Sequence, residues 1–468
     1  MNRPGISRSE FLRKSGTATA ALAAAALARK GGGVAARAGR PNLLLILTDD
    51  QQFWTFNERF MPKTTNLLAG RGLRLRGYVN DPVCTPSRAD ILTGRYTHGH
   101  GLTSNSGPNG GEDTFRARRL DRDTVATRIK AAGYRTAYVG KYMNSYEGAY
   151  VPPGWDRWFA MVGDHNKEAN YTVNSNGDLR TLDRDKHNET REFWRVAKNF
   201  VASNRSVPWF CYIGIHSPHG PYIPLHDHAF DGISLYNAPS RGEENMGDKP
   251  AFLRRLPRPS KEDIKGWRKD YEGKVEELQE VDDLVAEVLG ALAATGQLDN
   301  TYVFFATDNG YMMGEHRIDA KGAPYEEASR TPFVVRGPGV AQGESSSALV
   351  GLIDLPPTLC ELAGASTDGF DGRSLVPVLG GTVPATWRKH IFVEHFPGRR
   401  FRMLRSDRYV YVEYPGTNER ELYDMPNDPH QLRSVHRSPD KQALVSDFSA
   451  RLEQFAACSG ESCRAAEV

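Results

Sequence analysis

The chain has 468 residues, of which 39% are hydrophobic, so it can bury a large core in one big domain with a smaller one beside it. Lysine and arginine together number 60 against 57 aspartates and glutamates, and the formal charge of +3 argues against general nucleic-acid binding. After residue 40, no apolar run is long enough to span a membrane.

Residues 1–40 have the pattern of an export leader. Basic residues such as Arg8 and Arg13 precede an alanine-rich stretch at 18–28, which offers small residues for cleavage. The segment 7–14 resembles a twin-arginine signal in which Ser9 stands at the second arginine's place. We therefore expect a bacterial protein exported to the periplasm, the cell surface or the medium. Its mature chain would have no integral membrane segment.

Two apolar runs of strand length end in oxygen-bearing side chains. The run 43–47 leads into Asp49-Asp50, and the run 302–306 leads into Asp308-Asn309. Such runs suit strands buried on both faces of an α/β sheet, where ligands gather at the carboxyl ends of strands. Three carboxylates and an amide oxygen are hard ligands, and clustering them without a cation would cost free energy by mutual repulsion. Each pair alone fits a helix cap or a turn at least as well, but together with the segment 84–88 the four residues are expected to bind Ca²⁺ or Mg²⁺.

The segment Cys84-Thr85-Pro86-Ser87-Arg88 is predicted to begin a short helix. Thr85 can cap this helix, Pro86 suits its first position, and a periodic apolar pattern continues to Gly94. Cys84 would lie at the helix N-terminus, where backbone N–H groups and the macrodipole favour an anion, and Arg88 adds a fixed guanidinium. This pattern predicts an oxyanion site. A lone cysteine in such a place is equally compatible with an activated thiol or a small buried side chain.

Together with Leu92-Thr93-Gly94-Arg95, this segment resembles the signature of the type I sulfatases. In that family a formylglycine-generating enzyme oxidises the cysteine to formylglycine. The resemblance implies an α/β fold of the alkaline-phosphatase type, with a large mixed sheet flanked by helices and a small C-terminal antiparallel sheet and helix. It also implies that Arg88 is catalytic and that Cys84, as formylglycine, joins Asp49, Asp50, Asp308 and Asn309 around the cation.

The implied reaction is the hydrolysis of sulfate esters. A thiol is a poor partner for a sulfate ester, because covalent catalysis needs an intermediate that can be expelled again. A hydrated aldehyde carries two hydroxyls on one carbon. By resemblance, one attacks sulfur and the other, once deprotonated, releases sulfate. Exported sulfatases usually carry Ca²⁺, so we expect Ca²⁺, with Mg²⁺ as the alternative.

A helix is predicted over 124–132, followed by a short strand over 136–139 that leads into Gly140-Lys141-Tyr142. Sulfatases have a Gly-Lys-aromatic element at this place whose lysine contacts the sulfate, so the resemblance makes Lys141 a catalytic and substrate-binding residue. Many sulfatases have histidine next, whereas this chain has Met143. His98 and His316 are then the candidates for the missing base.

The residues Lys141 to Tyr146, followed by Pro152-Pro153-Gly154-Trp155, resemble one branch of the family in particular. This branch contains the N-acetylglucosamine-6-sulfatases and the heparan 6-O-endosulfatases, and the match adds Asn144 as a substrate-binding residue. The long basic hydrophilic domain of the endosulfatases is missing from this chain. Its absence favours an exo-acting enzyme or one with a small substrate.

A third buried strand is predicted over 210–215, and it leads into His216-Ser217-Pro218-His219. We expect His216 to be structural. By resemblance, His219 binds sulfate or protonates the leaving oxygen, and Lys321 is a second lysine that contacts sulfate. Between these residues, the sequence predicts surface loops and short helices over 226–272 and an amphipathic helix over 275–289 that packs on the sheet.

Beyond about residue 380 the pattern changes. Strand-like runs at 401–405 and 408–414 predict a hairpin, and Ser438-Pro439 opens a final helix. We expect a catalytic domain over 41–380 and a C-terminal subdomain over 381–468. The close spacing of Cys458 and Cys463 leaves a disulfide loop and two free thiols as alternatives, whereas Cys211 and Cys360 read as buried thiols.

These patterns together predict a sulfuric ester hydrolase that acts on a sulfated sugar such as N-acetylglucosamine 6-sulfate, in glycosaminoglycan degradation. Three alternatives stay open. The chain could be an arylsulfatase of broad specificity, or a phosphonate monoester or phosphodiester hydrolase. It could also be a noncatalytic protein that binds sulfated glycans on the same scaffold.

Overall fold

The computed structural model describes residues 39–163, 170–184, 186–203, 206–226, 228–396 and 400–468. The predicted export leader at 1–40 lies almost wholly outside these residues. Within them, no helix is both long and apolar enough to cross a membrane.

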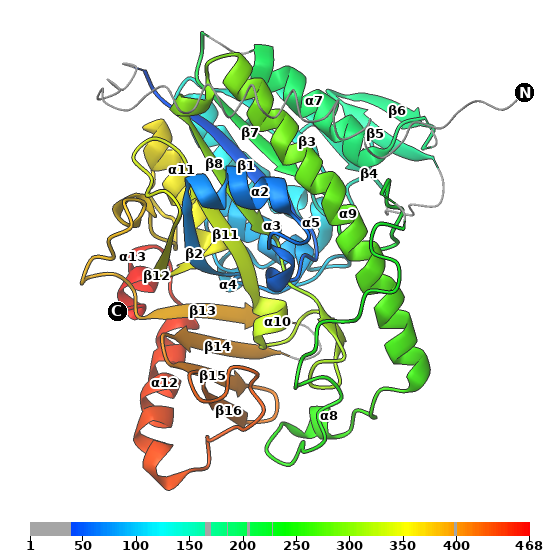
Figure 1. The fold of residues 1–468 in the computed structure, drawn as a ribbon. Helices are drawn as coiled ribbons and strands as arrows, with labels where there is room; N and C mark the ends of the chain where they lie inside the picture. The colour runs from blue at the N-terminus through cyan, green and yellow to red at the C-terminus, as the bar shows by residue number, and fades with distance from the viewer. Residues whose placement is uncertain (1–38, 164–169, 185, 204–205, 227, 397–399) are drawn as a thin grey trace, which may run out of the picture. The chain divides into compact units, whose positions relative to one another are not determined.

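In the described part of the chain, ten strands form one large mixed sheet (Figure 1). Its centre is parallel, because β1 pairs with β8 and β7, and β3 pairs with β7 and β4, all in the same direction. On one side of this centre, β11 pairs antiparallel with β8 and β2. On the other side, β5 pairs antiparallel with β4 and β6. In spatial order the strands are β12 (Glu344–Gly351), β2 (Leu73–Tyr78), β11 (Arg330–Arg336), β8 (Thr301–Thr307), β1 (Asn42–Thr48), β7 (Trp209–Gly214), β3 (Arg135–Gly140), β4 (Arg157–Val162), β5 (Tyr171–Ser175) and β6 (Asp178–Leu182).

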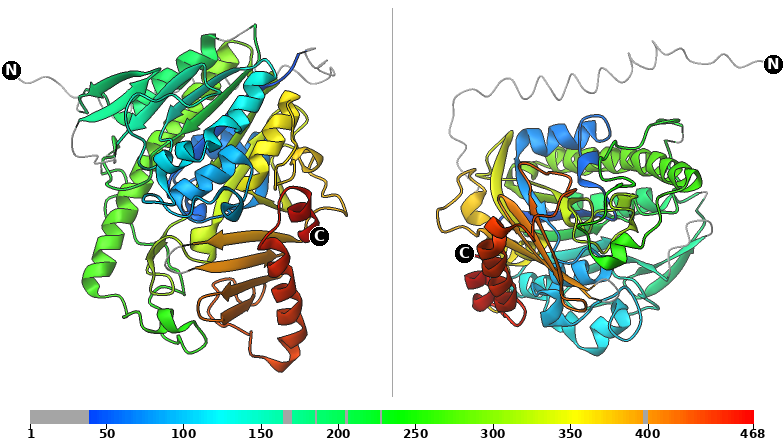
Figure 2. Two further views of the ribbon diagram at one scale, coloured as in Figure 1. Left: turned by 180° about the vertical axis from the view of Figure 1, so that it is seen from behind. Right: turned by 90° about the horizontal axis from the view of Figure 1, so that it is seen from below.

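Helices cover both faces of this sheet. Alternate residues of β1 explain why, since Leu44 and Ile46 join the apolar core on one face while Leu43 and Leu45 join the core on the other. One face carries α2 (Pro62–Leu67), α7 (Glu189–Ser203) and α9 (Lys261–Ala294) (Figure 1). The other carries α3 (Cys84–Thr93), α6 (Val125–Ala131) and α11 (Leu355–Ala363), which face the viewer when the molecule is turned around (Figure 2). The predicted α/β layers are confirmed.

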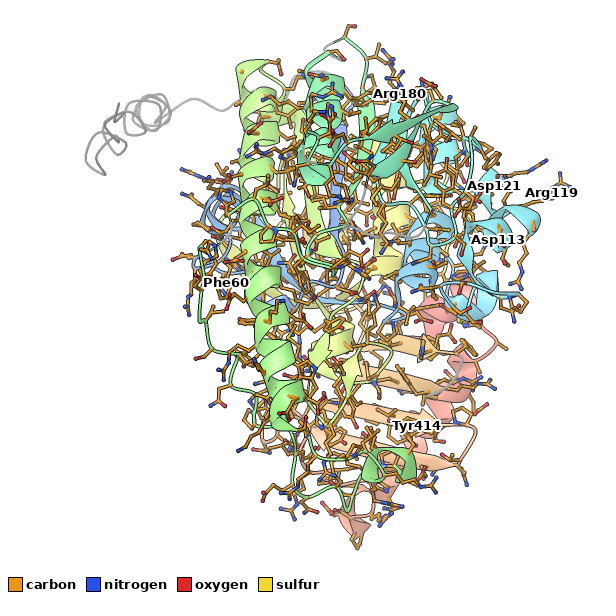
Figure 3. The ribbon with its side chains drawn as sticks, turned by 90° about the vertical axis from the view of Figure 1, so that its right-hand side faces the viewer. Phe60, Asp113, Arg119, Asp121, Arg180 and Tyr414 are labelled. Carbon is orange, nitrogen blue, oxygen red and sulfur yellow. A yellow bond between two sulfur atoms is a disulfide. The ribbon has the colours of Figure 1, made fainter. Side chains whose placement is uncertain are left out.

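The predicted amphipathic helix is confirmed, but it is longer than its apolar stripe. The helix α9 begins at Lys261 because Ser260 forms a capping box with Asp263, so the loops expected over 226–272 extend only to this cap. The first turns of α9 are largely exposed, which is why they lack an apolar pattern. Farther along, Phe60 packs edge-on against Tyr271 of α9 (Figure 3).

The C-terminal region forms its own small antiparallel sheet, in which four described strands follow chain order. They are β13 (His390–His395), β14 (Phe401–Ser406), β15 (Tyr409–Tyr414) and β16 (Glu419–Asp424). The helix predicted to open at Ser438-Pro439 is α12 (Gln442–Phe455), which starts three residues after Pro439, following a 3₁₀ turn, and is followed by one more short helix. Phe448 and Leu452 of α12 pack against Leu404 and Tyr411 of this sheet. The remaining short elements are α4 (Thr97–His100), α5 (Gly111–Ala117), α8 (Ala251–Arg254), α10 (Glu326–Ser329), α13 (Glu461–Ala466), β9 (Met312–Met313) and β10 (Asp319–Ala320).

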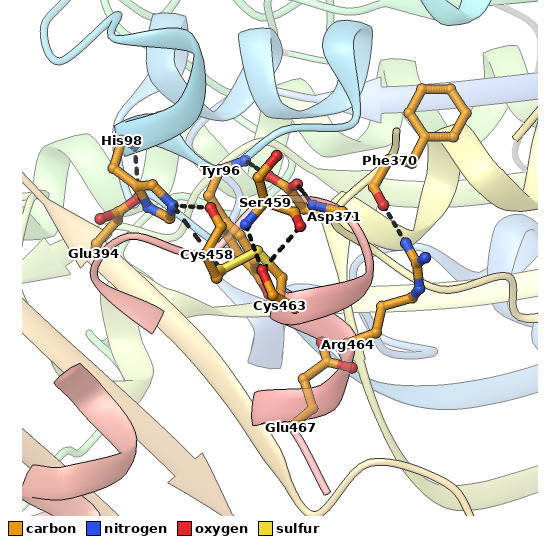
Figure 4. Close-up of a disulfide and its surroundings, with 12 residues drawn as sticks. Tyr96, His98, Phe370, Asp371, Glu394, Cys458, Ser459, Cys463, Arg464 and Glu467 are labelled. Atoms are coloured by element: carbon orange, nitrogen blue, oxygen red, sulfur yellow. Dashed lines mark hydrogen bonds and ion pairs between the residues drawn. A yellow bond between two sulfur atoms is a disulfide. The ribbon is translucent and has the colours of Figure 1, made fainter. Parts of the chain in front are cut away.

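Two of the five cysteines form a disulfide. Cys458 and Cys463 are bonded at the start of α13, so the disulfide alternative is confirmed (Figure 4). The carbonyl of Cys458 lies 3.0 Å from His98 Nε2, and this contact ties the C-terminal segment to α4. Cys211 and Cys360 are buried free thiols, as predicted.

Candidate active site

The site lies where four adjacent strands of the sheet end. The neighbours β8, β1, β7 and β3 run parallel, and β1 and β8 are in register from Asn42 to Thr48. Asp49-Asp50 and Asp308-Asn309 therefore emerge side by side although they are far apart in sequence. The strand β7 leads into His219, and β3 leads into Lys141.

Cys84 opens α3 and points at this edge. Its Sγ lies 3.3 Å from Asp49 Oδ1, 2.8 Å from Lys321 Nζ and 3.7 Å from Lys141 Nζ. Burial, together with the charge of Asp49, raises the pKa of the Cys84 thiol to about 12, although the two lysines oppose this shift. An unmodified thiol would therefore stay protonated and a weak nucleophile.

The start of this helix differs from the prediction. The helix begins at Cys84 itself with Val83 as its N-cap, so Thr85 is not the cap. The Thr85 hydroxyl instead donates to Asn144 Oδ1 at 3.0 Å, and the Asn144 N–H donates back to Thr85 Oγ1 at 3.2 Å. Asn144 is thereby fixed beside the first turn of α3. Its predicted contact with substrate stays a prediction.

Arg88 is buried beneath the cluster and bridges its carboxylates. Its Nε donates to Asp308 Oδ2 at 2.8 Å and its Nη2 to Asp49 Oδ2 at 3.2 Å, while Nη1 donates to the Lys141 carbonyl at 2.7 Å. Burial would lower the pKa of this guanidinium, but Asp308 and Asp49 hold it well above the ordinary value. This geometry makes Arg88 a residue that positions the carboxylates and Lys141.

Two lysines flank the sulfur of Cys84. Lys141 is fully buried and ion-paired with Asp49, and Lys321 is ion-paired with Asp50. Burial would lower the pKa of Lys321, but Asp50 raises it well above the ordinary value. Both ammonium groups therefore stay charged beside the atom where the nucleophile would be, and a sulfate would find positive charge on both sides.

His219 lies at the side of the cluster where Asp50 is. Its Nε2 lies 3.6 Å from Asp50 Oδ2, and its Nδ1 lies 2.6 Å from the Gly220 carbonyl. Burial lowers the pKa of His219 to about 4, so the imidazole is neutral rather than a further positive charge. Because a carbonyl only accepts, Nδ1 carries the hydrogen and Nε2 is the basic nitrogen. His216 stacks on His219 and pairs with Glu189, in keeping with its predicted structural role.

The donor set fits a divalent cation. One ligand atom from each of Asp49, Asp50, Cys84 and His219 lies within 4.8 Å of the others. Asn309 Oδ1 is buried and has no hydrogen-bond partner among the described residues, which is the state expected of an oxygen that awaits a cation. Burial, together with Asp49, raises the pKa of Asp308 to about 6, which reflects crowded carboxylates that a cation would relieve.

His98 and His316 are not part of this cluster. The His98 ring nitrogens contact Glu394 at 2.7 Å and the Cys458 carbonyl at 3.0 Å. His316 contacts Glu243 at 2.8 Å and stacks on Tyr325. The suggestion that either replaces a base at position 143 was therefore wrong, because both rings are held elsewhere by buried partners.

One site residue was missed from the sequence. Lys274 of α9 is buried, and its Nζ donates to the backbone carbonyls of Asp50 and Pro218 at 3.1 Å each, below the ring of Tyr311. Burial lowers the pKa of Lys274 to about 8. The available signal was its spacing, since a lysine four residues before Leu278 lies on the apolar stripe of the helix. Lys274 thus joins the two loops that carry Asp50 and His219.

Comparison with known proteins gives two family matches. Residues 41–365 match the family model described as Sulfatase, and residues 314–457 match the one described as N-sulphoglucosamine sulphohydrolase, C-terminal. A putative extracellular sulfatase Sulf-1 homolog of Caenorhabditis elegans is 31% identical over 81% of this chain and 56% of its own length. The N-acetylglucosamine-6-sulfatase of Homo sapiens is 30% identical over 92% of this chain and 87% of its own.

The fold also matches solved structures. One, described as a complex with its substrate D-glucosamine-2-N,6-O-disulfate, superposes with a TM-score of 0.77 over 91% of this chain and 99% of that one, at 22% identity. The chain spans little more than half of the Caenorhabditis relative and about a third of a Drosophila melanogaster relative that is 34% identical.

Proposed function

Because this chain belongs to the sulfatase family, we propose that it hydrolyses the sulfate ester of a sulfated sugar, with residue 84 as formylglycine beside a divalent cation. One observation carries the proposal. Cys84 Sγ, at the start of α3, lies within hydrogen-bond reach of a carboxylate and of two lysines that belong to different parts of the chain. Such preorganised charge commonly supplies the largest share of catalysis.

Each residue around position 84 has its own proposed role in the reaction. A hydrated aldehyde at position 84 would supply the hydroxyl that attacks sulfur and a second hydroxyl for the release of sulfate. Asp49 Oδ1, 3.3 Å from Cys84 Sγ, is placed to accept a proton there. Lys141 and Lys321 hold the sulfuryl oxygens from two sides, and Arg88 keeps Asp49 and Asp308 in position. His219 Nε2 faces the same space from the Asp50 side.

For the cation, we propose Asp49, Asp50, Asp308 and Asn309 as ligands, together with the oxygen at position 84. A bound cation would neutralise the crowded carboxylates and polarise a sulfuryl oxygen. Ca²⁺ is proposed over Mg²⁺, because exported members of the family usually carry it. The carboxylate and amide oxygens themselves suit either ion.

For the substrate, we propose N-acetylglucosamine 6-sulfate or a glycan that ends in it. The proposal is supported by relatives named N-acetylglucosamine-6-sulfatase and by a solved relative of the same fold described with a glucosamine disulfate. The sequence Lys141 to Trp155 has the pattern of that branch, and Asn144 is proposed to contact the sugar. We further propose export, maturation by a formylglycine-generating enzyme, a catalytic domain over 41–380 and a C-terminal subdomain over 381–468.

The test begins with the mass of the tryptic peptide Gly77 to Arg88 from protein made in its native host. Formylglycine is expected at residue 84. The matured protein should then release sulfate from N-acetylglucosamine 6-sulfate faster than it cleaves a matched phosphate diester. Unmodified Cys84 throughout, or faster cleavage of the diester, would overturn the proposal, and binding of the sugar without turnover would point to a glycan-binding protein.

A further inference from the structure

A groove of about 360 Å³ is lined by residues of β2, β11 and β12, which lie at one edge of the large sheet (Figure 1). Its floor is the outer face of β2, where Arg74 and Arg76 point to the same side because they are two residues apart. Arg74 is in register with Val334 of β11 and with Ser345 of β12. The wall toward the active site is formed by Phe53, Phe56 and Arg330.

The lining of this groove has one sign of charge. Among the described residues that line it there are three arginines and no carboxylate. A larger cavity of about 890 Å³, between α7 and α9, offers a contrast, since five lysines and arginines face five aspartates and glutamates there. Of these two cavities, the smaller groove is the one with a net preference for an anion.

The arginines are held in fixed orientations. The Arg74 guanidinium lies 5.2 Å from the Phe56 ring centre, and that of Arg330 lies 4.3 Å from the ring centre of Phe53. A stacked guanidinium keeps its N–H groups at its edge, where they can donate to an oxyanion. In the described part of the chain, Arg74 forms no ion pair with a carboxylate. Its electrostatic interaction with an acidic residue is with Glu58, which it does not contact as an ion pair.

The other two arginines already have acidic partners behind the groove. Arg76 pairs with Asp407 at 3.1 Å, and Arg330 pairs with Glu326 at 3.6 Å. Arg76 Nη2 also donates to the backbone carbonyl of Asp407 at 3.1 Å, but the Asp407 side chain is 78% exposed, so its ion pair with Arg76 Nη1 is weak and readily exchanged. Glu326 is buried and also forms an ion pair with Arg405, so Arg330 takes part in a charge network that stabilises the fold. Arg74 and Arg76 are thus the two donors available to a ligand.

We propose that this groove is a second binding site, which holds a sulfate group on another sugar of a sulfated glycan. Guanidinium groups match the paired oxygens of a sulfate, and the hydroxyl of Ser345 on the rim can bind a sugar hydroxyl. The choice of a sulfated glycan rests on the proposed function, whereas the groove and its charge do not.

The position of the groove links it to the active site. Phe53 follows Asp50 by three residues, so the loop that carries the proposed cation ligands also forms a wall of the groove. Thr331, in the lining, hydrogen-bonds through its side chain to Thr307, the residue before Asp308. A glycan chain that reaches both places would bind more tightly than its terminal sugar alone.

Binding is best measured in the full chain with Cys84→Ala, so that no turnover consumes the ligand. The probe is a sulfated tetrasaccharide prepared from heparin, added with saturating N-acetylglucosamine 6-sulfate to occupy the active site. Arg74→Gln is expected to raise Kd about tenfold, and the pair Arg74→Gln and Arg76→Gln about thirtyfold or more. The desulfated tetrasaccharide should show no binding that depends on these residues.

The matched control is Arg180→Gln. Arg180 is an exposed arginine on β6, at the opposite edge of the same sheet, and its replacement should leave Kd unchanged (Figure 3). Asp407→Asn provides a gain of function, because removing the acid beside Arg76 should lower Kd about threefold. An unchanged Kd in both arginine variants, or complete displacement of the tetrasaccharide by N-acetylglucosamine 6-sulfate, would overturn the proposal. Absence of sulfate release by the matured parent protein, measured separately, would count against the proposed function and leave this binding result standing.

Discussion

Lys321→Met should abolish most of the sulfatase activity while leaving the fold intact. Lys321 Nζ lies 2.8 Å from Cys84 Sγ, so a sulfate bound at residue 84 would have an oxygen within about 4 Å of this charge. At that separation, with an effective dielectric constant of about 20, two unit charges attract by about 4 kcal/mol. Methionine has a similar length and no charge, so the variant should lose the charge interactions of Lys321 with the sulfate and with Asp50 while keeping the bulk of the side chain.

A loss of about 4 kcal/mol from the transition state corresponds to a rate about 1,000 times lower, and single donors of this kind are commonly worth about 100 to 1,000. The assay is kcat/KM for N-acetylglucosamine 6-sulfate on protein whose residue 84 is fully converted, as shown by the mass of the peptide Gly77 to Arg88. The control is Lys265→Met, which removes an exposed lysine near the start of α9.

Metal loading must be equal in the two preparations, because Lys321 also pairs with Asp50. Removing this lysine takes a positive charge away from a proposed cation ligand, so the variant should hold its cation at least as tightly as the parent. If kcat/KM of the loaded Lys321→Met protein stays within about threefold of the parent, Lys321 does not contact the reacting sulfate, and the electrostatic argument fails.

Three further outcomes are expected. Asp308→Ala should remove stoichiometric Ca²⁺ after dialysis, measured by metal analysis, and full retention would exclude it as a ligand. Lys274→Met should lower the free energy of unfolding by about 2 to 4 kcal/mol, because two buried carbonyls lose a charged donor; a urea midpoint equal to the parent's would contradict this. Burial raises the pKa of Glu421 to about 7 from 4.5, so its ionisation destabilises the folded chain as pH rises between these values, and Glu421→Gln should gain about 3 kcal/mol over the parent by pH 8. Equal stabilities at pH 8 would refute that shift.

Much of the site could be predicted because several of its residues directly follow strands, and each of these strands is recognisable from a short run of apolar residues. A buried apolar run followed by Asp49 indicates both a strand and its carboxyl end, and the same holds for Asp308. That β1 and β8 are neighbours is a separate fact, since nothing near residue 48 specifies residue 307 as its partner. The resemblance of the Cys84 segment to a family motif supplied that long-range information.

The errors have a common cause in contacts between distant parts of the chain. Thr85 has the residue type of a helix cap, but its hydroxyl bonds to Asn144, and the helix starts two residues earlier than predicted, at Cys84. Lys274 looks like an irregularity in an apolar stripe until the loops after β1 and β7 are seen to end against it. The strands β4 to β6 were also not predicted. For β6 the reason is local, because it is largely exposed and lacks an alternating apolar pattern.

The methionine at position 143 raises the question of which residues accept and donate protons during the reaction. Met143 is buried in the apolar core beside the sheet, so its side chain takes no part in the polar cluster. In the described part of the chain, His219 is the one imidazole whose nitrogen lies within 4.8 Å of Cys84 and both aspartates. It is neutral, with Nε2 as its basic nitrogen. On the proposed mechanism, Asp49 would accept the proton on the side of residue 84 and His219 would be the imidazole on the side of Asp50, so no second histidine at position 143 would be needed.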